Sequence, residues 1–222
     1  MTANPNALEP QMSEELIDSG HDAQRGGMDP ALLGMMLFIA SEVMFFAALF
    51  AAYFNAAATL PVFPPEGTEE FISLFKFPFL PLIMTAVLLT SSVTMQLATN
   101  RIRQGDRTGM NRAMALTLGL GIFFLVLWAT DYAILITQDD FGIDSGVYGT
   151  LFYTLTGFHG AHVLGGIVGM AVILSRGLAG QFSARHHVAV EAVHYYWHFV
   201  DVVWILLVTV IYILPHLGGG AA

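Results

Sequence analysis

Residues 191–207 read EAVHYYWHFVDVVWILL, an apolar run that also contains a glutamate, two histidines and an aspartate. A charged side chain at the centre of a bilayer costs roughly 3 kcal/mol, so such groups face the interior of a bundle or a water-filled cavity. On a helical wheel the four ionisable side chains fall within one arc of about 80°. The stretch therefore predicts a membrane helix with one polar ridge. The ridge consists of Glu191, His194, His198 and Asp201.

The composition of the whole chain also indicates a membrane protein. Of its 222 residues, 55% are hydrophobic and 11% are charged, whereas a soluble domain carries about 25% charged residues. The chain has no cysteine, which excludes disulfides, iron–sulfur clusters and metal sites with thiolate ligands. We expect no nucleic-acid partner, because no basic patch is available to contact phosphate.

Five segments are apolar over about 20 residues, the length that crosses the ~30 Å of hydrocarbon in a bilayer. Pro30 precedes the first segment, Pro81 stands at the start of the second and Pro215 follows the fifth. Proline suits a helix start and cannot continue a helix end. The sequence thus predicts an all-α membrane protein, a five-helix bundle that makes residues 32–222 a single transmembrane domain. We expect the spans at residues 32–55, 79–100, 114–137, 148–175 and 192–214.

The distribution of charge predicts the orientation. Residues 1–31 hold six acids and one base without apolar periodicity, so we expect a polar, mobile leader that is not a signal peptide. Seven of the eight basic residues fall on one side of the alternating spans. Because basic residues concentrate in cytoplasmic loops, we expect a cytoplasmic N-terminus and an outside C-terminus.

Other polar and small residues inside the spans also predict contacts. Glu42 lies about 15 Å into the first span at 1.5 Å per residue, and we expect it to bond a histidine of another helix, at position 159, 162 or 198. His159 and His162 are three residues apart and should share a face. The fourth span has a small residue every four positions, which favours close helix packing within the bundle over a dimerisation face. That stripe consists of Gly157, Ala161, Gly165 and Gly169.

Three kinds of site are compatible with these residues. Glu191-x-x-His194 is the helical pair of di-iron bundles, but those sites need a second pair and two more glutamates. A haem could lie between His198 and a histidine of the fourth span, although these histidines come in adjacent pairs beside acids, which suits hydrogen bonding. The third kind is a buried network of acids and histidines, which can also pass protons. The sequence favours the network and leaves the other two open.

The motifs of the chain resemble those of subunit III of the haem–copper terminal oxidases, the cytochrome c oxidase subunit III family. The matching blocks follow the family's order and cover about residues 33–214. They are SEVMFF at 41–46, GDR at 105–107, DSGVYG at 144–149, TGFHGAHV at 156–163 and HHVAVEAVHYYWHFVDVVW at 186–204.

The resemblance implies a five-helix member of the family without haem or copper of its own, since these cofactors belong to subunits I and II. It implies docking against subunit I, contact with subunit II and other members of the complex, and support of proton uptake. It also implies structural phospholipids in a cleft, which we expect between helices 1–2 and helices 3–5. We expect the protein in a bacterial plasma membrane.

The resemblance further implies roles for particular residues. We expect a buried, proton-related network of Glu42, Asp131, His159, His162, Glu191, His194, His198 and Asp201, in which His194 departs from the family pattern. His186 and His187 are candidates to collect protons at the surface, because histidine titrates near neutral pH. The candidates for phospholipid binding are Phe45, Phe46, Phe50, Arg101 and Arg185, since arginine matches phosphate geometry.

The function expected from these features is that of a non-catalytic subunit of a proton-pumping oxidase that passes electrons from cytochrome c to oxygen. The alternatives are a quinol-oxidase subunit III, an accessory protein of nitric oxide reductase and an independent haem or di-iron membrane protein.

Overall fold

The computed structural model describes residues 29–68, 72 and 79–215, so the predicted leader lies almost entirely outside the described part. Five helices in this part are long and apolar enough to cross a membrane, which confirms the predicted all-α bundle. The fifth helix continues as a π-helical segment, η3. The elements are α2 Pro30–Thr59, α4 Leu80–Arg103, α5 Arg107–Thr137, α6 Gly146–Leu178, α7 Val188–Leu207 and η3 Val208–Ile213.

The helices extend beyond their apolar segments, and the turn between α4 and α5 shows why. We predicted a loop at residues 101–113, but only residues 104–106 lie outside the two helices. Gly105, with φ +81°, ends α4, and Asp106 caps α5 by accepting a hydrogen bond from the Gly109 amide at 2.8 Å. Arginines occupy the ends of both helices, beyond the apolar segments. Only the part of a helix that lies in the hydrocarbon of the bilayer needs apolar side chains, so the helices can continue past it.

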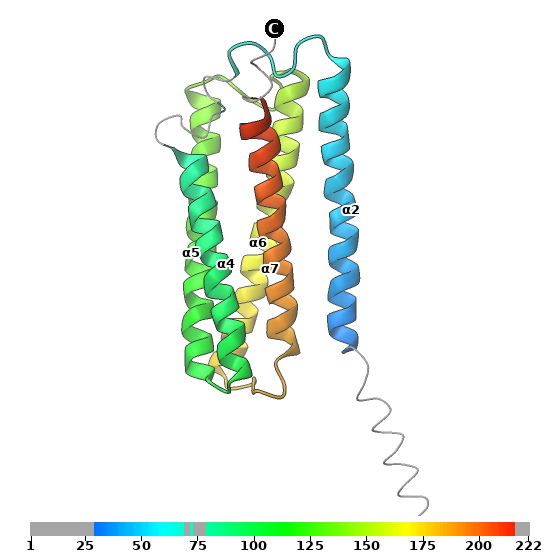
Figure 1. Ribbon diagram of the computed structural model, residues 1–222. Coiled ribbons are helices and arrows are strands. Elements are labelled where there is room, and N and C mark those ends of the chain that lie inside the picture. Colours follow the sequence, from blue (N-terminus) through cyan, green and yellow to red (C-terminus); the bar gives the residue numbers. More distant parts are fainter. Residues whose placement is uncertain (1–28, 69–71, 73–78, 216–222) are drawn as a thin grey trace, which may run out of the picture.

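The arrangement of the helices corrects one prediction. Helices α4 and α5 run side by side as an antiparallel pair, whereas α2 stands at the other side of the bundle and packs mainly on α7 and α6 (Figure 1). The predicted cleft between helices 1–2 and helices 3–5 is therefore not present as such, and this prediction is wrong. The short turn at residues 104–106 keeps the second and third helices adjacent, while the long connection after Thr59 lets α2 leave its sequence neighbour.

The core is built around two tryptophans of α7. Trp197 and Trp204 are 0% and 2% exposed, and their indole N–H groups donate to Ser91 and Thr85 of α4, each at 3.0 Å. These bonds satisfy buried donors while the rings fill the centre of the bundle. They also fix α7 against α4 at two levels.

Glycines let other helices approach the tryptophan rings. A Cβ atom at Gly166 would lie 2.7 Å from the Trp197 ring, and one at Gly160 would lie 2.8 Å from Trp128. Neither glycine belongs to the predicted small-residue stripe, in which Ala161 and Gly165 are exposed. The prediction of close packing is right for this helix, but the stripe is not the face that packs most tightly.

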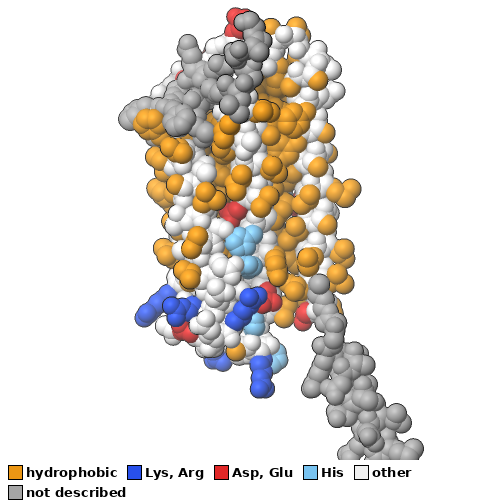
Figure 2. All heavy atoms as spheres, viewed as in Figure 1, with side chains coloured by type: hydrophobic (Ala, Val, Ile, Leu, Met, Phe, Trp, Pro, Cys, Tyr) orange, Lys and Arg blue, Asp and Glu red, His pale blue; other side chains and the backbone are white. Residues whose placement is uncertain are grey.

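The surface divides into an apolar middle and one basic end. Figure 2 shows hydrophobic side chains over the length of the bundle and a cluster of basic side chains at its lower end. The turns that carry the arginines of α4, α5 and α6 meet there, and we call it the basic end. The predicted orientation places this end in the cytoplasm.

Candidate functional site

Glu42 of α2 and His162 of α6 form a hydrogen-bonded pair inside the bundle. Glu42 Oε2 lies 3.0 Å from His162 Nε2, and the two side chains are 22% and 15% exposed. The other ring nitrogen, Nδ1, lies 2.7 Å from the Phe158 carbonyl oxygen. Because a carbonyl oxygen only accepts, Nδ1 carries a hydrogen, and the bond to Glu42 requires one further proton on the histidine or on the carboxyl. The prediction that Glu42 bonds a histidine of another helix is confirmed.

Aromatic rings surround this pair. The Phe46 ring lies edge-on to His162 at 5.0 Å between centroids, and the Phe199 ring lies at 6.2 Å. Tyr196 of α7 donates its hydroxyl to the His162 carbonyl oxygen at 2.9 Å. A low-polarity shell strengthens the hydrogen bond that it encloses. The pair therefore ties α2 to α6 at a level where α7 also contacts both helices.

A second set of polar residues lies between α4 and α7, and we call it the α4–α7 polar column. It begins at the basic end, where Arg103 donates to Glu191 Oε1 from Nη2 at 2.8 Å and from Nε at 3.1 Å. His187 Nε2 lies 3.3 Å from the same oxygen. The column comprises Ser92, Arg103, His187, Glu191, His194, His198 and Asp201.

The deeper part of the column consists of two histidines and an aspartate. The rings of His194 and His198 meet edge-on with centroids 4.3 Å apart. His198 Nδ1 lies 2.8 Å from Ser92 Oγ and 3.7 Å from Asp201 Oδ2. Acidic and histidine side chains rise from the basic end into the apolar surface in the same view (Figure 2). The structure thus brings together the four residues predicted to form one ridge.

Asp201 is the innermost member of the column. The residue is 4% exposed, and neither carboxyl oxygen has a hydrogen-bond partner among the described residues. His194 Nδ1 is likewise buried without such a partner. Buried polar atoms in proteins are nearly always hydrogen-bonded, so each exception calls for a physical explanation.

His159 and His162 do not share surroundings as predicted. His159 is 0% exposed and packs between Phe124 of α5 and Trp204 of α7, with ring centroids 6.0 and 5.1 Å away. His162 instead reaches α2, because three residues on a helix still separate two side chains by about 60°. The rings of His159, His162 and His198 therefore each lie against different neighbours. Among the described residues, no group of three histidine, aspartate or glutamate side chains is arranged to hold a metal ion.

Two further candidates, Asp131 and His186, belong to neither of these two sites. Asp131 is half-buried on α5, a helix that contributes no residue to the column. Its neighbour Tyr132 bonds Thr156 of α6 at 2.6 Å between hydroxyl oxygens. His186 is exposed at the basic end. Sequence reasoning missed Ser92 and Arg103, since serine in a membrane helix often bonds its own backbone and Arg103 was assigned to a loop.

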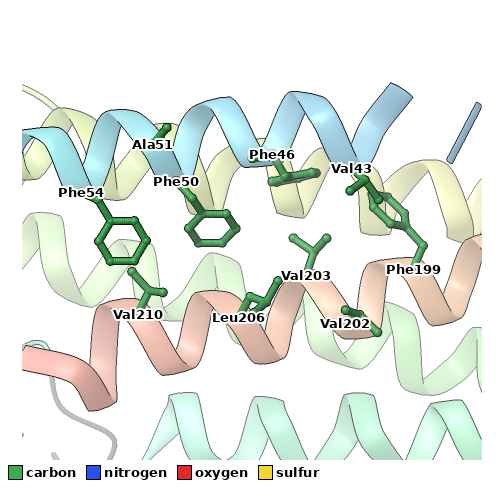
Figure 3. A pocket seen from close by; sticks show the side chains of 11 residues that line it. Val43, Phe46, Phe50, Ala51, Phe54, Phe199, Val202, Val203, Leu206 and Val210 are labelled. Carbon is green, nitrogen blue, oxygen red and sulfur yellow. The ribbon is translucent and has the colours of Figure 1, made fainter. Parts of the chain in front are cut away.

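An apolar groove of about 560 Å³ separates part of α2 from α7. Figure 3 shows side chains of the two helices lining it from opposite sides. Of the predicted lipid-binding residues, Phe46 and Phe50 line the groove, whereas Phe45 packs against Phe158 with ring centroids 5.0 Å apart. Arg101 and Arg185 lie at the basic end. The lining residues are Val43, Phe46, Ala47, Phe50, Ala51, Phe54, Phe199, Val202, Val203, Leu206 and Val210.

Comparisons with known proteins agree with the motifs. The family model for cytochrome c oxidase subunit III matches residues 13–216. Cytochrome c oxidase subunit 3 of Sus scrofa is 41% identical over 184 residues, which cover 81% of this chain and 67% of that protein. The corresponding protein of Lumbricus terrestris is 44% identical over 184 residues, 81% of this chain and 68% of that protein. The chain therefore belongs to the cytochrome c oxidase subunit III family.

Proposed function

We propose that the chain is the non-catalytic subunit III of a proton-pumping oxidase that transfers electrons from cytochrome c to oxygen. The observation that carries this proposal is the pairing of ionisable groups inside the bundle. Glu42 bonds His162, and His198 bonds Ser92, so these side chains serve contacts between helices. The haem and copper then belong to partner subunits I and II, and this chain binds neither.

The basic end supports a role in proton supply. His186 is exposed there, and His187 contacts Glu191, which also accepts two hydrogen bonds from Arg103. Imidazole is the side-chain group that ordinarily gains and loses protons near neutral pH, so histidines gathered at a surface can collect them. With this end in the cytoplasm of a bacterial cell, the cluster raises the rate of proton uptake into an adjacent subunit I.

The groove between α2 and α7 supports a role in lipid binding. Its lining is entirely apolar and its volume of about 560 Å³ is large enough for hydrocarbon chains. Arginines at the basic end, among them Arg101 and Arg185, are suited to phosphate headgroups. The groove begins at Val43, about 20 Å along α2 from that end, so these arginines would bind a different lipid from the one whose chains fill the groove. Bound phospholipid would hold α2 on the bundle while other surfaces dock against subunit I.

Removal of the chain from the oxidase tests the proposal. Steady-state oxygen consumption should persist without it, but should slow most at high pH, where free protons are scarce, and should decline during turnover. Addition of the wild-type chain should restore both properties, whereas an H186A/H187A chain should restore durability without the full rate at high pH. An unchanged pH profile together with unchanged durability would leave only passive packing and would refute the proposal.

Two further measurements separate the alternatives. The isolated chain should show no Soret band and no stoichiometric iron or copper, and either finding would establish a haem or metal protein. The subunits that co-purify, and the oxidation of cytochrome c or of quinol by that complex, distinguish a cytochrome c oxidase from a quinol oxidase or a nitric oxide reductase.

A further inference from the structure

The α4–α7 polar column ends near the middle of the membrane. Residues Val188–Ile213 form the spanning segment to which α7 belongs, and at 1.5 Å per residue Asp201 lies roughly 20 Å from its first residue. From the basic end the column proceeds through Glu191, His194 and His198 in steps of one helical turn. Each step joins a side chain that can accept a proton to another of the same kind.

Beyond Asp201 the described residues continue the column no further. The next large side chain on this face, Trp204, donates its indole N–H to Thr85 at 3.0 Å. His159 of α6 lies behind the Trp204 ring, and α5 reaches this layer through Phe124, whose ring lies edge-on to Trp204 with centroids 4.9 Å apart. Val208 and Ile211 follow as buried apolar residues. The column is therefore open toward the basic end and closed in the opposite direction.

The charges inside the column do not balance unless a proton is bound. Arg103 and Glu191 compensate each other at the basic end, which leaves Asp201 with two histidines. An uncompensated carboxylate in this position would be costly. One proton held by Asp201 and His198 gives either two neutral groups or an aspartate beside an imidazolium, and both arrangements carry no net charge.

Ser92 lies beside both of these arrangements. Its hydroxyl oxygen is 2.8 Å from His198 Nδ1, and a hydroxyl can donate to a neutral imidazole or accept from a protonated one. Asp201 Oδ2 lies 3.7 Å from the same nitrogen, so a small rotation of the imidazole brings Nδ1 closer to either oxygen. The serine therefore accommodates both positions of the proton.

We propose that Asp201 and His198 hold one exchangeable proton, which reaches them from the basic end through His194. His194 is suited to this transfer because an imidazole accepts a proton on one nitrogen and releases one from the other. Its ring lies 4.3 Å from that of His198. The site itself is independent of the proposed function, and the assignment of its open end to the cytoplasm rests on the orientation predicted from the basic residues.

Infrared spectroscopy of the intact oxidase, with this chain isotopically labelled at aspartate and histidine, tests the site. The wild-type spectrum should contain the band of one protonated group, an aspartic acid carbonyl or an imidazolium, that D201N abolishes. S92A should change how the intensity divides between the acid and the imidazolium, because it removes the hydroxyl group beside His198 Nδ1. D131N, which alters another aspartate of a spanning helix, should leave the band in place. A band that survives D201N would overturn the proposal.

Transfer into D2O tests the route. The band should shift on deuteration in the wild type and shift more slowly in H194Q. H159Q, the matched change at a buried histidine outside the column, should exchange at the wild-type rate. If H194Q does not assemble into the oxidase, E191Q at the basic end replaces it. Exchange in these column variants at the wild-type rate would overturn the route through His194.

Discussion

His162 Nε2 lies 3.0 Å from Glu42 Oε2 and joins two helices across 120 residues of chain. Since the histidine already donates from Nδ1 to the Phe158 carbonyl oxygen, the two side chains share one proton. The pair is the principal polar contact that we identify between α2 and α6. Loss of this pair should therefore weaken the packing of α2 on the bundle.

Replacement of Glu42 by leucine should loosen α2. The change leaves His162 Nε2 without its partner, and an unsatisfied buried group costs about 1–3 kcal/mol. The free energy of unfolding in detergent, measured by helical circular dichroism, should fall by this amount. In the double variant E42L/H162L part of the loss should return, because neither partner is then left alone. M44A, at a side chain of α2 that is 74% exposed, is the control; strictly additive losses would contradict a direct interaction.

Alanine at Gly166 should destabilise the bundle. Its Cβ atom would lie 2.7 Å from Trp197, and overpacking of a core costs typically 1–3 kcal/mol. The same substitution at Gly119 meets nothing within 4 Å and should be neutral or stabilising, since alanine favours a helix over glycine by roughly 0.5–1 kcal/mol. Thermal unfolding of the two variants checks this contrast, and equal melting temperatures would show that the core yields at Trp197.

Alanine at Ser91 should weaken the contact between α4 and α7. The variant leaves the Trp197 indole N–H buried without its acceptor, at a cost of about 1–3 kcal/mol. T130A is the control, because Thr130 is exposed and bonds only the Val126 carbonyl of its own helix. Unfolding in detergent should separate the two variants. A loss in T130A as large as that in S91A would contradict the assigned role of the bond.

Phenylalanine at Ala47 should fill the groove between α2 and α7. Ala47 lines that groove, whereas the neighbouring Ala48 is exposed on α2 and does not. If hydrocarbon chains occupy the groove, A47F should co-purify with less phospholipid than the wild type, and A48F should retain the wild-type amount. Phosphorus analysis of the purified oxidase measures both. Equal phospholipid content in A47F and the wild type would exclude the groove as a lipid site.

Much of the fold could be predicted because hydropathy indicates which residues contact lipid. The five spans follow from hydropathy, and the ridge on α7 follows from hydropathy together with helical periodicity. Hydropathy does not record which helix lies next to which, since lipid and helix surfaces are equally apolar. The predicted cleft was wrong for this reason. We assigned residues 101–113 to a loop because of their arginines. Recognition of the three-residue turn at residues 104–106 would have placed α4 and α5 side by side.

The candidate site was predictable in part. The sequence placed Glu42 beside a histidine of another helix because a membrane carboxyl needs a partner and few were available. It could not distinguish His159 from His162, whose surroundings differ through the packing of Trp204. Ser92 carried no signal of its own, since one serine among the hydroxyl residues of α4 looks like any other until α7 places His198 beside it.

The separation of Glu42 from His162 along the chain has a consequence for biogenesis. A ribosome that adds about 5–20 residues per second needs on the order of ten seconds to complete the 120 residues between them. During that time α2 is already in the bilayer, while α6 and α7, the helices on which it packs, have not been made. Its carboxyl therefore lacks its histidine partner until α6 is inserted, and must meanwhile be shielded by an insertion factor, a partner subunit or water.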